Sequence, residues 1–266
     1  MKYLKYTFLS ICCLFMANIA TAQFLVYGTA GLSGLQYSPE GGTSGARSGF
    51  GGGIGYSLAL SSSWKIGLAA EMATYSSKAS FGTLSEGYEY GTGENKFRIS
   101  YSLKDYEEKQ NITALSVPLT LQYQTGGIIG FFLSGGVKLG MPVSARASIS
   151  PGTVNVSGEY EYEGQTYTNL PQHGFPEGTK LPETESKIDL GYSVAATLEA
   201  GVRIKKVYAG LYLDYGLTDM RKTKDRHALE YQESTPAVFV HNSILNTGFV
   251  NKVNLFSAGL KIRVQF

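Results

Sequence analysis

Apolar and polar residues alternate with a period of two along most of the chain. In 188–205, every even-numbered residue from Ile188 to Ile204 is apolar or aromatic, and the odd-numbered residues are small, polar or charged. A period of two predicts β-strands that present two chemically different faces. The same pattern predicts eight strands, within 24–37, 50–60, 64–72, 115–123, 129–141, 188–205, 207–217 and 256–266.

The connections between these segments alternate between short and long. Short polar turns are expected at 61–63, 125–127 and 205–206, and long links at 39–48, 82–111, 151–187 and 221–252. This asymmetry is typical of a transmembrane β-barrel. The predicted fold class is therefore all-β: an antiparallel up-and-down barrel of eight strands with both termini on the periplasmic, short-turn side. Hairpin-like patterns at 159–168 and 87–102 leave ten strands open as an alternative.

The polar face of each strand carries mostly Gly, Ala and Ser, whereas a soluble surface would carry many Lys and Glu side chains. We therefore expect the apolar face to meet lipid and the small residues to line a narrow lumen. Aromatic residues are expected in two girdles at the membrane interfaces. The inner girdle comprises Trp64, Tyr123, Phe131 and Phe266, and the outer one Phe50, Tyr192, Tyr215 and Phe256.

The first residues resemble a secretory signal peptide. Lys2 and Lys5 precede an apolar run over 7–20, and Ala20 and Ala22 bracket a small-x-small cleavage site. The run is too short for a transmembrane anchor. We expect residues 1–22 to be removed and 23–266 to form the outer-membrane β-barrel domain. Removal takes away both cysteines and two lysines, which cancels the formal net charge of +2.

The C-terminal segment carries a second targeting pattern. Leu260, Ile262, Val264 and Phe266 recur at two-residue steps and end on an aromatic residue. This resembles the signal that the outer-membrane assembly machinery reads in the last strand of a barrel. We predict that machinery as a partner during biogenesis, and outer-membrane lipid as a permanent one.

Composition excludes several functions. Two cysteines cannot build a disulfide-rich scaffold or a four-ligand zinc site, and a net charge of +2 gives no reason to expect nucleic-acid binding. His173, His227 and His241 are all expected in loops. Asp219, Asp225, His227 and Glu230 form the nearest approach to a catalytic constellation, but a solvated polar loop is the preferred interpretation. No catalytic, cofactor-binding or metal-binding residue is predicted.

Charged residues on the lumen face are expected to pair and plug the barrel, because unpaired charges in a narrow interior are costly. The predicted structural network consists of Glu71, Lys138, Glu199, Arg203, Asp214 and Lys261. Within it, Glu199, Arg203, Asp214 and Lys261 are expected to form one connected group. Lys65, Asp189 and Arg263 also fall on the lumen face. A pore lining is the alternative role for these charges.

Residues 115–123 (LSVPLTLQY) and 210–217 (GLYLDYGL) resemble strands of the Bacteroidota-type outer-membrane β-barrel family, which is similar in architecture to OmpA- and OmpX-type eight-stranded barrels. The resemblance implies an outer-membrane location and this fold, and no peptidoglycan-binding domain is expected after the last strand. We therefore predict a non-catalytic barrel with a plugged lumen and long extracellular loops, in a structural or surface-interaction role. A narrow passive pore and a lipid-modifying outer-membrane enzyme remain as alternatives, and no extracellular ligand is named.

Overall fold

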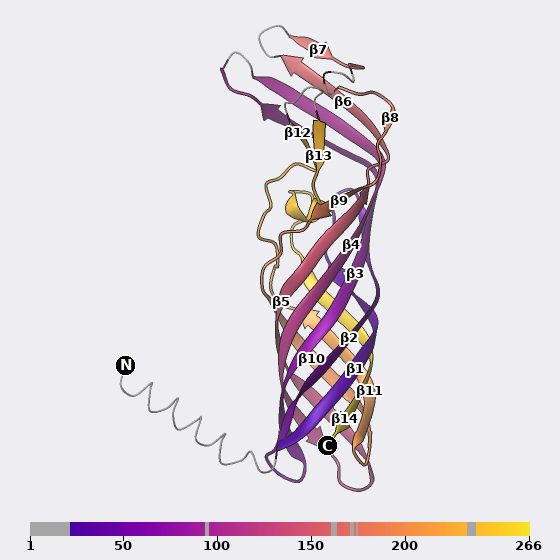
Figure 1. Ribbon diagram of the computed structural model, residues 1–266, viewed down its shortest axis with the longest axis vertical. Helices are drawn as coiled ribbons and strands as arrows, with labels where there is room; N and C mark the ends of the chain where they lie inside the picture. The colour runs from indigo at the N-terminus through magenta and orange to yellow at the C-terminus, as the bar shows by residue number, and fades with distance from the viewer. Residues whose placement is uncertain (1–21, 94–95, 161–163, 171–172, 174, 233–237) are drawn as a thin grey trace, which may run out of the picture.

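The computed structural model describes residues 22–93, 96–160, 164–170, 173, 175–232 and 238–266. Within them, eight antiparallel strands close into a barrel (Figure 1). Each strand pairs with its neighbour in the chain, and β1 pairs with β14 to close the ring. The barrel strands are β1 (Ala22–Gln36), β2 (Thr43–Ala59), β3 (Trp64–Tyr90), β4 (Phe97–Gln124), β5 (Ile129–Ser150), β10 (Ser193–Ile204), β11 (Val207–Gly216) and β14 (Asn254–Gln265). The predicted eight-stranded up-and-down barrel is confirmed.

Alternate residues of these strands point to opposite sides of the barrel wall. On β5, Phe131 and Leu133 are exposed, whereas Phe132 and Ser134, which alternate with them, are buried. Trp64 and Tyr123, from neighbouring strands, meet edge to face on the outside with ring centroids 5.2 Å apart. The apolar face is therefore the outer one, as the period of two predicts.

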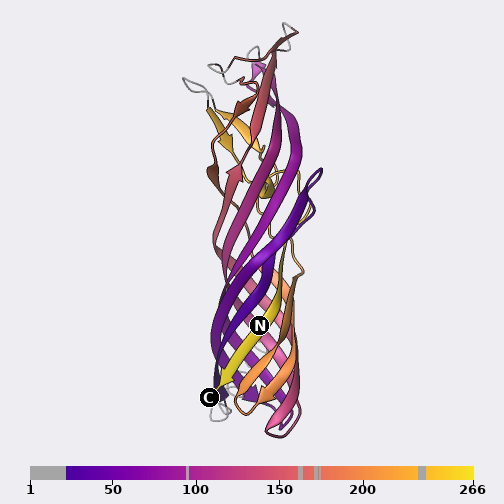
Figure 2. The same cartoon turned by 90° about the vertical axis from the view of Figure 1, so that its right-hand side faces the viewer.

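Strands β3, β4 and β5 continue far beyond the barrel and form a tall sheet (Figure 2). The β3–β4 hairpin remains paired up to Tyr90 and Phe97. The long link expected over 82–111 is therefore mostly strand, and it contains the hairpin expected over 87–102. Near Asp105, which adopts φ +60°, the buried positions on β4 shift by one residue. Alternation survives on both sides of this irregularity, and a continuous hairpin can therefore form.

Further strands complete the tall sheet. β6 (Thr153–Tyr160) replaces β5 as the neighbour of β4 at the distal end, and β7 (Gln165–Tyr167) pairs with β6. These two strands form the hairpin expected near 159–168, although 161–163 lie outside the described residues. β8 (Thr179–Lys180) pairs with β6, and β9 (Thr184–Lys187) pairs with β5. In the described part of the chain these strands extend the sheet without enlarging the ring of eight.

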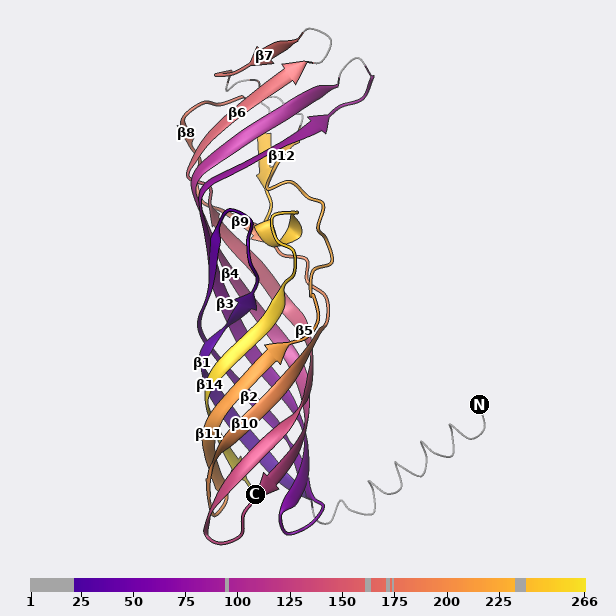
Figure 3. The same ribbon diagram turned by 180° about the vertical axis from the view of Figure 1, so that it is seen from behind.

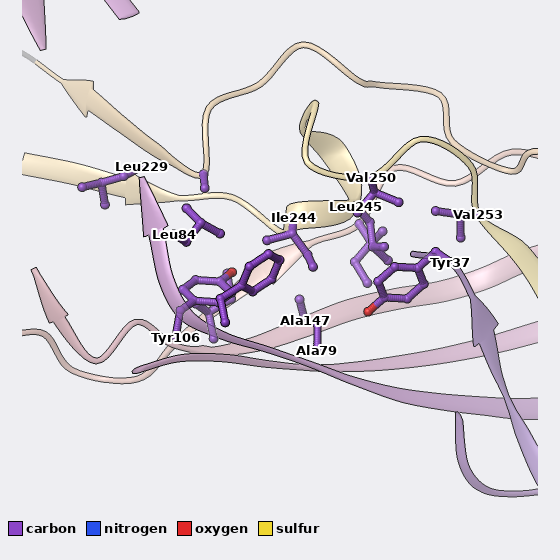
Figure 4. Close-up of a cluster of buried hydrophobic side chains, with 14 of the residues drawn as sticks. Tyr37, Ala79, Leu84, Tyr106, Ala147, Leu229, Ile244, Leu245, Val250 and Val253 are labelled. Atoms are coloured by element: carbon purple, nitrogen blue, oxygen red, sulfur yellow. The ribbon is translucent and has the colours of Figure 1, made fainter. Parts of the chain in front are cut away.

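A hydrophobic core lies above the barrel, between the tall sheet and the segment that links β11 to β14. This segment contains β12 (Leu229–Gln232), β13 (Val238–His241) and the 3₁₀ turn η4 (Ile244–Asn246), and it lies along one side of the sheet (Figure 3). Figure 4 shows its buried side chains, including Ile244 and Leu245, facing Ala79, Tyr106 and Ala147 of the sheet. The long link predicted over 221–252 is thus a packed cover.

Two residues predicted to face lipid belong to this core instead. Ile188 and Leu190 are buried above the barrel, and β10 begins only at Ser193. Their apolar character continues the alternation of β10, but they cover the sheet from the connection before that strand. Asp189, between them, consequently lies outside the lumen and is 3.5 Å from Arg226.

The predicted targeting segments are only partly described. Ala22 is the first residue of β1, whereas Ala20 lies outside the described residues, and cleavage there stays a prediction. Helices in the described ranges are all too short or too polar to span a membrane.

The core above the barrel should be able to loosen without unfolding the barrel. Leu245 is 0% exposed in this core, and Leu245→Ala should destabilise its packing by about 2–5 kcal/mol. In micelles, limited proteolysis should then cut faster within 217–253, while the barrel keeps its heat-dependent shift in electrophoresis. Leu211→Ala, on the exposed outer face of β11, is the matched control and should leave cleavage unchanged. Equal acceleration in both variants would contradict an independent core.

Candidate functional site

An ion cluster crosses the middle of the barrel. The Lys138 ammonium on β5 lies 2.6 Å from a carboxylate oxygen of Glu71 on β3, and it also contacts the Asp214 carboxylate on β11. The Tyr27 hydroxyl on β1 donates a hydrogen bond of 2.9 Å to Glu71. Side-chain exposure of the three charged residues is 7% or less. The buried cation thus ties three strands together, and Tyr27 adds a fourth through Glu71.

A second cluster lies on a neighbouring part of the lumen wall. Glu199 on β10 is 3.3 Å from the ammonium of Lys261 and 3.7 Å from the guanidinium of Arg263, both on β14. The Lys261 ammonium also lies 4.2 Å from the centroid of the Tyr27 ring. Because Tyr27 donates to Glu71, its side chain touches both clusters.

Arg203 does not join either cluster, and the predicted single network of Glu199, Arg203, Asp214 and Lys261 must be corrected. The Arg203 guanidinium donates to the backbone carbonyls of Thr125 and Gly127, at 3.2 and 2.7 Å, in the short turn between β4 and β5. Arg203 lies four residues below Glu199, roughly 13 Å along the strand. β10 lies between the strands of Lys138 and Asp214, with the small Ala195 opposite Lys138 and Thr197 opposite Asp214.

Large side chains fill the lumen toward the short turns. The Lys65 ammonium donates to Gln23, Tyr208 and Gln265 at 2.9–3.1 Å. The Arg263 guanidinium lies over the rings of Phe132 and Tyr208 and donates to Gln122 at 2.5 Å. Buried cations and rings therefore meet across the barrel, and the geometry is that of a filled interior.

Above the barrel, a buried carboxylate holds the cover against the sheet. Glu108 on β4 accepts hydrogen bonds from the Tyr106 hydroxyl, the Gln110 amide, the Ser243 hydroxyl and the Ile244 backbone N–H at 2.5–2.9 Å. Burial raises the pKa of Glu108, and these donors oppose the rise. Sequence reasoning missed this residue, although the inward positions Tyr106, Glu108 and Gln110 form a polar run on one face of the strand.

The possible catalytic constellation is dispersed. The His227 Nδ1 atom lies 2.8 Å from the Glu86 carboxylate, and its ring stacks on Tyr88 at 3.9 Å between centroids. Asp219 instead pairs with Arg221 at 3.0 Å. Among the described residues, Asp225 and Glu230 form no hydrogen bond or ion pair with His227, in keeping with the polar-loop interpretation.

The other two histidines lie apart. His173 lies in the connection between β7 and β8, whereas His241 is the last residue of β13 and not of a loop. Burial lowers the pKa of His241 to about 4, so this side chain is neutral at pH 7. Among the described residues, no group of three His, Cys, Asp or Glu could hold a metal ion.

The predicted assembly residues lie along the closing strand. Leu260 and Ile262 are exposed on the outer face of β14, and Val264 shares that face with them. The Phe266 backbone N–H donates to the Phe24 carbonyl at 2.9 Å, beside the ring of Phe24. The residues proposed to be read during assembly thus also close the barrel seam in the folded chain.

No family model and no curated protein matches the chain. Solved structures show a partial likeness. Neisserial surface protein A (NspA) aligns over 92% of this chain and 99% of its own, at 12% identity and a TM-score of 0.38. Ail, the attachment invasion locus protein of Yersinia pestis solved with the heparin analogue sucrose octasulfate, aligns over 92% of this chain and 97% of its own. The identity is 9% and the TM-score is 0.34. The outer membrane protein OprG from Pseudomonas aeruginosa aligns over 92% of this chain and 94% of its own, at 12% identity and a TM-score of 0.34. At these scores the likeness has no weight for function, and the barrel rests on this chain's own strand pairing.

The central cluster predicts a strong, asymmetric response to substitution. Lys138→Met removes the cation and leaves Glu71 and Asp214 as buried, facing carboxylates, so unfolding by urea in micelles should become easier by about 3–5 kcal/mol. The triple change Glu71→Gln, Lys138→Met and Asp214→Asn should recover most of that loss. Lys206→Met, in an exposed turn, serves as control and should stay within about 0.5 kcal/mol of the wild type. A triple variant no more stable than Lys138→Met would contradict this account.

Proposed function

We propose that the protein is a non-catalytic outer-membrane barrel that anchors a tall, rigid sheet and presents it outside the cell for surface interactions. The observation that carries the proposal is the length of the β3–β4 hairpin. Only 64–72 and 115–123 carry the apolar outer face, whereas the hairpin continues to Tyr90 and Phe97. That continuation adds about 60 Å of strand beyond the apolar zone.

The membrane location is supported by an apolar band around the barrel. Outward side chains from Ile129 to Met141 on β5 are exposed and mostly aliphatic or aromatic. Twelve residue steps at the usual barrel tilt span about 30 Å, which matches the hydrocarbon thickness. A soluble protein rarely leaves so large an apolar surface uncovered. We place the short turns and both termini in the periplasm, as in bacterial outer-membrane barrels and in the Bacteroidota-type family that the strands resemble.

An anchoring role fits the interior better than conduction or catalysis does. The Glu71–Lys138–Asp214 cluster and the rings of Tyr208 and Phe132 occupy the lumen of an eight-stranded barrel, which is narrow to begin with. His227, Asp219 and Glu108 are engaged in separate structural contacts, with Glu86, Arg221 and Ser243 respectively.

The tall sheet offers a surface for contact. Its uncovered face carries small polar residues at mid-height, including Ser85, Ser100 and Asn155, and a row of Glu89, Arg98 and Glu159 in register near the tip. The opposite face is covered by the β11–β14 segment. A flat sheet face held by a packed core is pre-organised for binding, which reduces the ordering entropy that a partner must offset.

Cysteine labelling on intact cells tests the proposed topology and height. Cleavage of the predicted signal removes Cys12 and Cys13, so single cysteines can be introduced without background. Ser100→Cys on the distal sheet should react with a membrane-impermeant maleimide, even one attached to a bulky protein. Ser62→Cys in a short turn should react only after lysis. Ser76→Cys, next to the apolar band, should react with a small maleimide but poorly with the bulky one.

Wild-type protein and permeabilised cells serve as controls for this experiment. Labelling of Ser62→Cys but not Ser100→Cys on intact cells would contradict the proposed orientation. Equal access of the bulky probe to Ser76→Cys and Ser100→Cys would contradict the proposed height of the sheet.

Purified protein should also fail to conduct. Planar-bilayer recordings of the wild type should show no stable openings, because buried side chains occupy the lumen. Reproducible openings whose conductance changes in Lys138→Met would favour a pore and overturn the anchoring role.

A further inference from the structure

The outer face of the wall changes its chemistry directly above the apolar band on β3, β4, β5 and β9. The register places successive rows of side chains side by side. The lowest row carries the hydroxyls of Thr74, Thr113 and Ser144. The next carries Ser76, Asn111, Arg146 and Lys187, and the third Lys78, Lys109, Ser148 and Glu185. Figure 1 shows these strands next to one another.

Two pairs of cations in these rows lie directly opposite each other on paired strands. Lys78 faces Lys109 across β3 and β4, and Arg146 faces Lys187 across β5 and β9. Like charges in such positions destabilise a sheet unless an anion lies between or beside them. We refer to Lys78, Lys109, Arg146 and Lys187 as the basic face.

The protein's own acids only partly balance this face. Lys78 pairs with Glu107 at 2.6 Å, and this bond lowers the pKa of the Glu107 carboxyl, with a smaller contribution from Lys109. Arg146 is 3.6 Å from Glu185, with both side chains at least 70% exposed, which makes a weak contact. Lys109 and Lys187 form no ion pair in the described ranges. The face therefore keeps an excess of positive charge toward the outside.

The height of the basic face matches one layer of a membrane. The outward residues just below it, Met72 and Leu115, are exposed and apolar. Asn111, in the row of Arg146, lies four residues above Leu115, roughly 10 Å higher when the strand is tilted by about 40°. Headgroups occupy the layer immediately outside the hydrocarbon, and long Lys and Arg side chains reach along the wall toward it. A shallow hollow there is lined by Phe50, Thr74, Ser76, Asn111, Ser144 and Arg146, among others.

Resting on the proposed membrane orientation, we propose that the basic face binds phosphate-bearing headgroups of lipids in the outer leaflet. The cations neutralise the phosphates, and the hydroxyl and amide groups of the lower rows donate to headgroup oxygens. A lipid is the occupant, and not a soluble anion, because the face is continuous with the apolar band on the same strands. Acyl chains would lie on Met72 and Leu115 while the headgroup meets the cations above them.

Native mass spectrometry of the micelle-refolded full chain provides the test. The probes are bis-phosphorylated lipid A and zwitterionic phosphatidylcholine, with inorganic pyrophosphate as a soluble competitor. The variant Lys109→Gln, Arg146→Gln and Lys187→Gln should bind lipid A more weakly by a factor on the order of 100, taking about 1 kcal/mol per cation near an anionic surface. Binding of phosphatidylcholine should not change.

The matched control removes three cations from the distal sheet: Arg98→Gln, Lys104→Gln and Lys180→Gln, all at exposed positions. It should bind lipid A like the wild type, and heat-dependent electrophoretic shifts should show that both variants fold. Unchanged binding in the basic-face variant, or an equal loss in the control, would overturn the proposal. Full displacement of lipid A by equimolar pyrophosphate would point to a soluble anion and also overturn it. The assay measures lipid binding itself. A reversed labelling pattern on cells with retained lipid A binding would therefore overturn the proposed function and the outer-leaflet placement, but not the binding of phosphate-bearing headgroups by the basic face.

Discussion

Closure of the strand ring is the constraint on which the rest of this structure depends. In lipid, a backbone N–H or C=O without a partner costs several kcal/mol, so a sheet crossing the membrane must have no free edge. Here β1 supplies the last edge, pairing with β2 on one side and β14 on the other from Leu25 to Ser33. Once the ring closes, every side chain must face either lipid or a narrow lumen. The period of two in the sequence follows directly from that choice.

The narrow lumen explains the character of its charges. Eight strands leave room for side chains but not for bulk water, and a buried ion must therefore find its counter-ion within the protein. Lys138 meets this requirement with two carboxylates from strands on either side, and Tyr27 links them to the Glu199 cluster. The small residue Ala195 on β10 lies directly opposite Lys138 on the same part of the wall.

Sequence alone was sufficient for the strands that cross the membrane, since lipid on one face and packed small residues on the other impose a regular pattern. Prediction from the sequence failed for residues that are buried by contacts with a distant part of the chain. Ile188 and Leu190 continue the alternation of β10, and only the fold shows that they cover the tall sheet. Glu108 falls within the predicted link 82–111, and two of its four donors belong to Ser243 and Ile244, far away in sequence. Arg203 was misplaced because a period of two gives the face of a residue but not its height.

The tall sheet poses a physical problem that the barrel does not. Above the membrane the ring opens, because β2 ends while the β3–β4 hairpin continues. One apolar face of this hairpin would then meet water. A hairpin alone is marginally stable in water and needs a covered hydrophobic face. The β11–β14 segment provides that cover with Leu229, Ile244 and Leu245, and Glu108 fixes it in register through hydrogen bonds to Ser243 and Ile244. Because this segment returns to β14, the closing strand of the barrel, the same connection that completes the ring also stabilises the sheet above it. The anchor and the displayed surface are therefore joined at two places, through the continuous β3–β4 hairpin and through the cover.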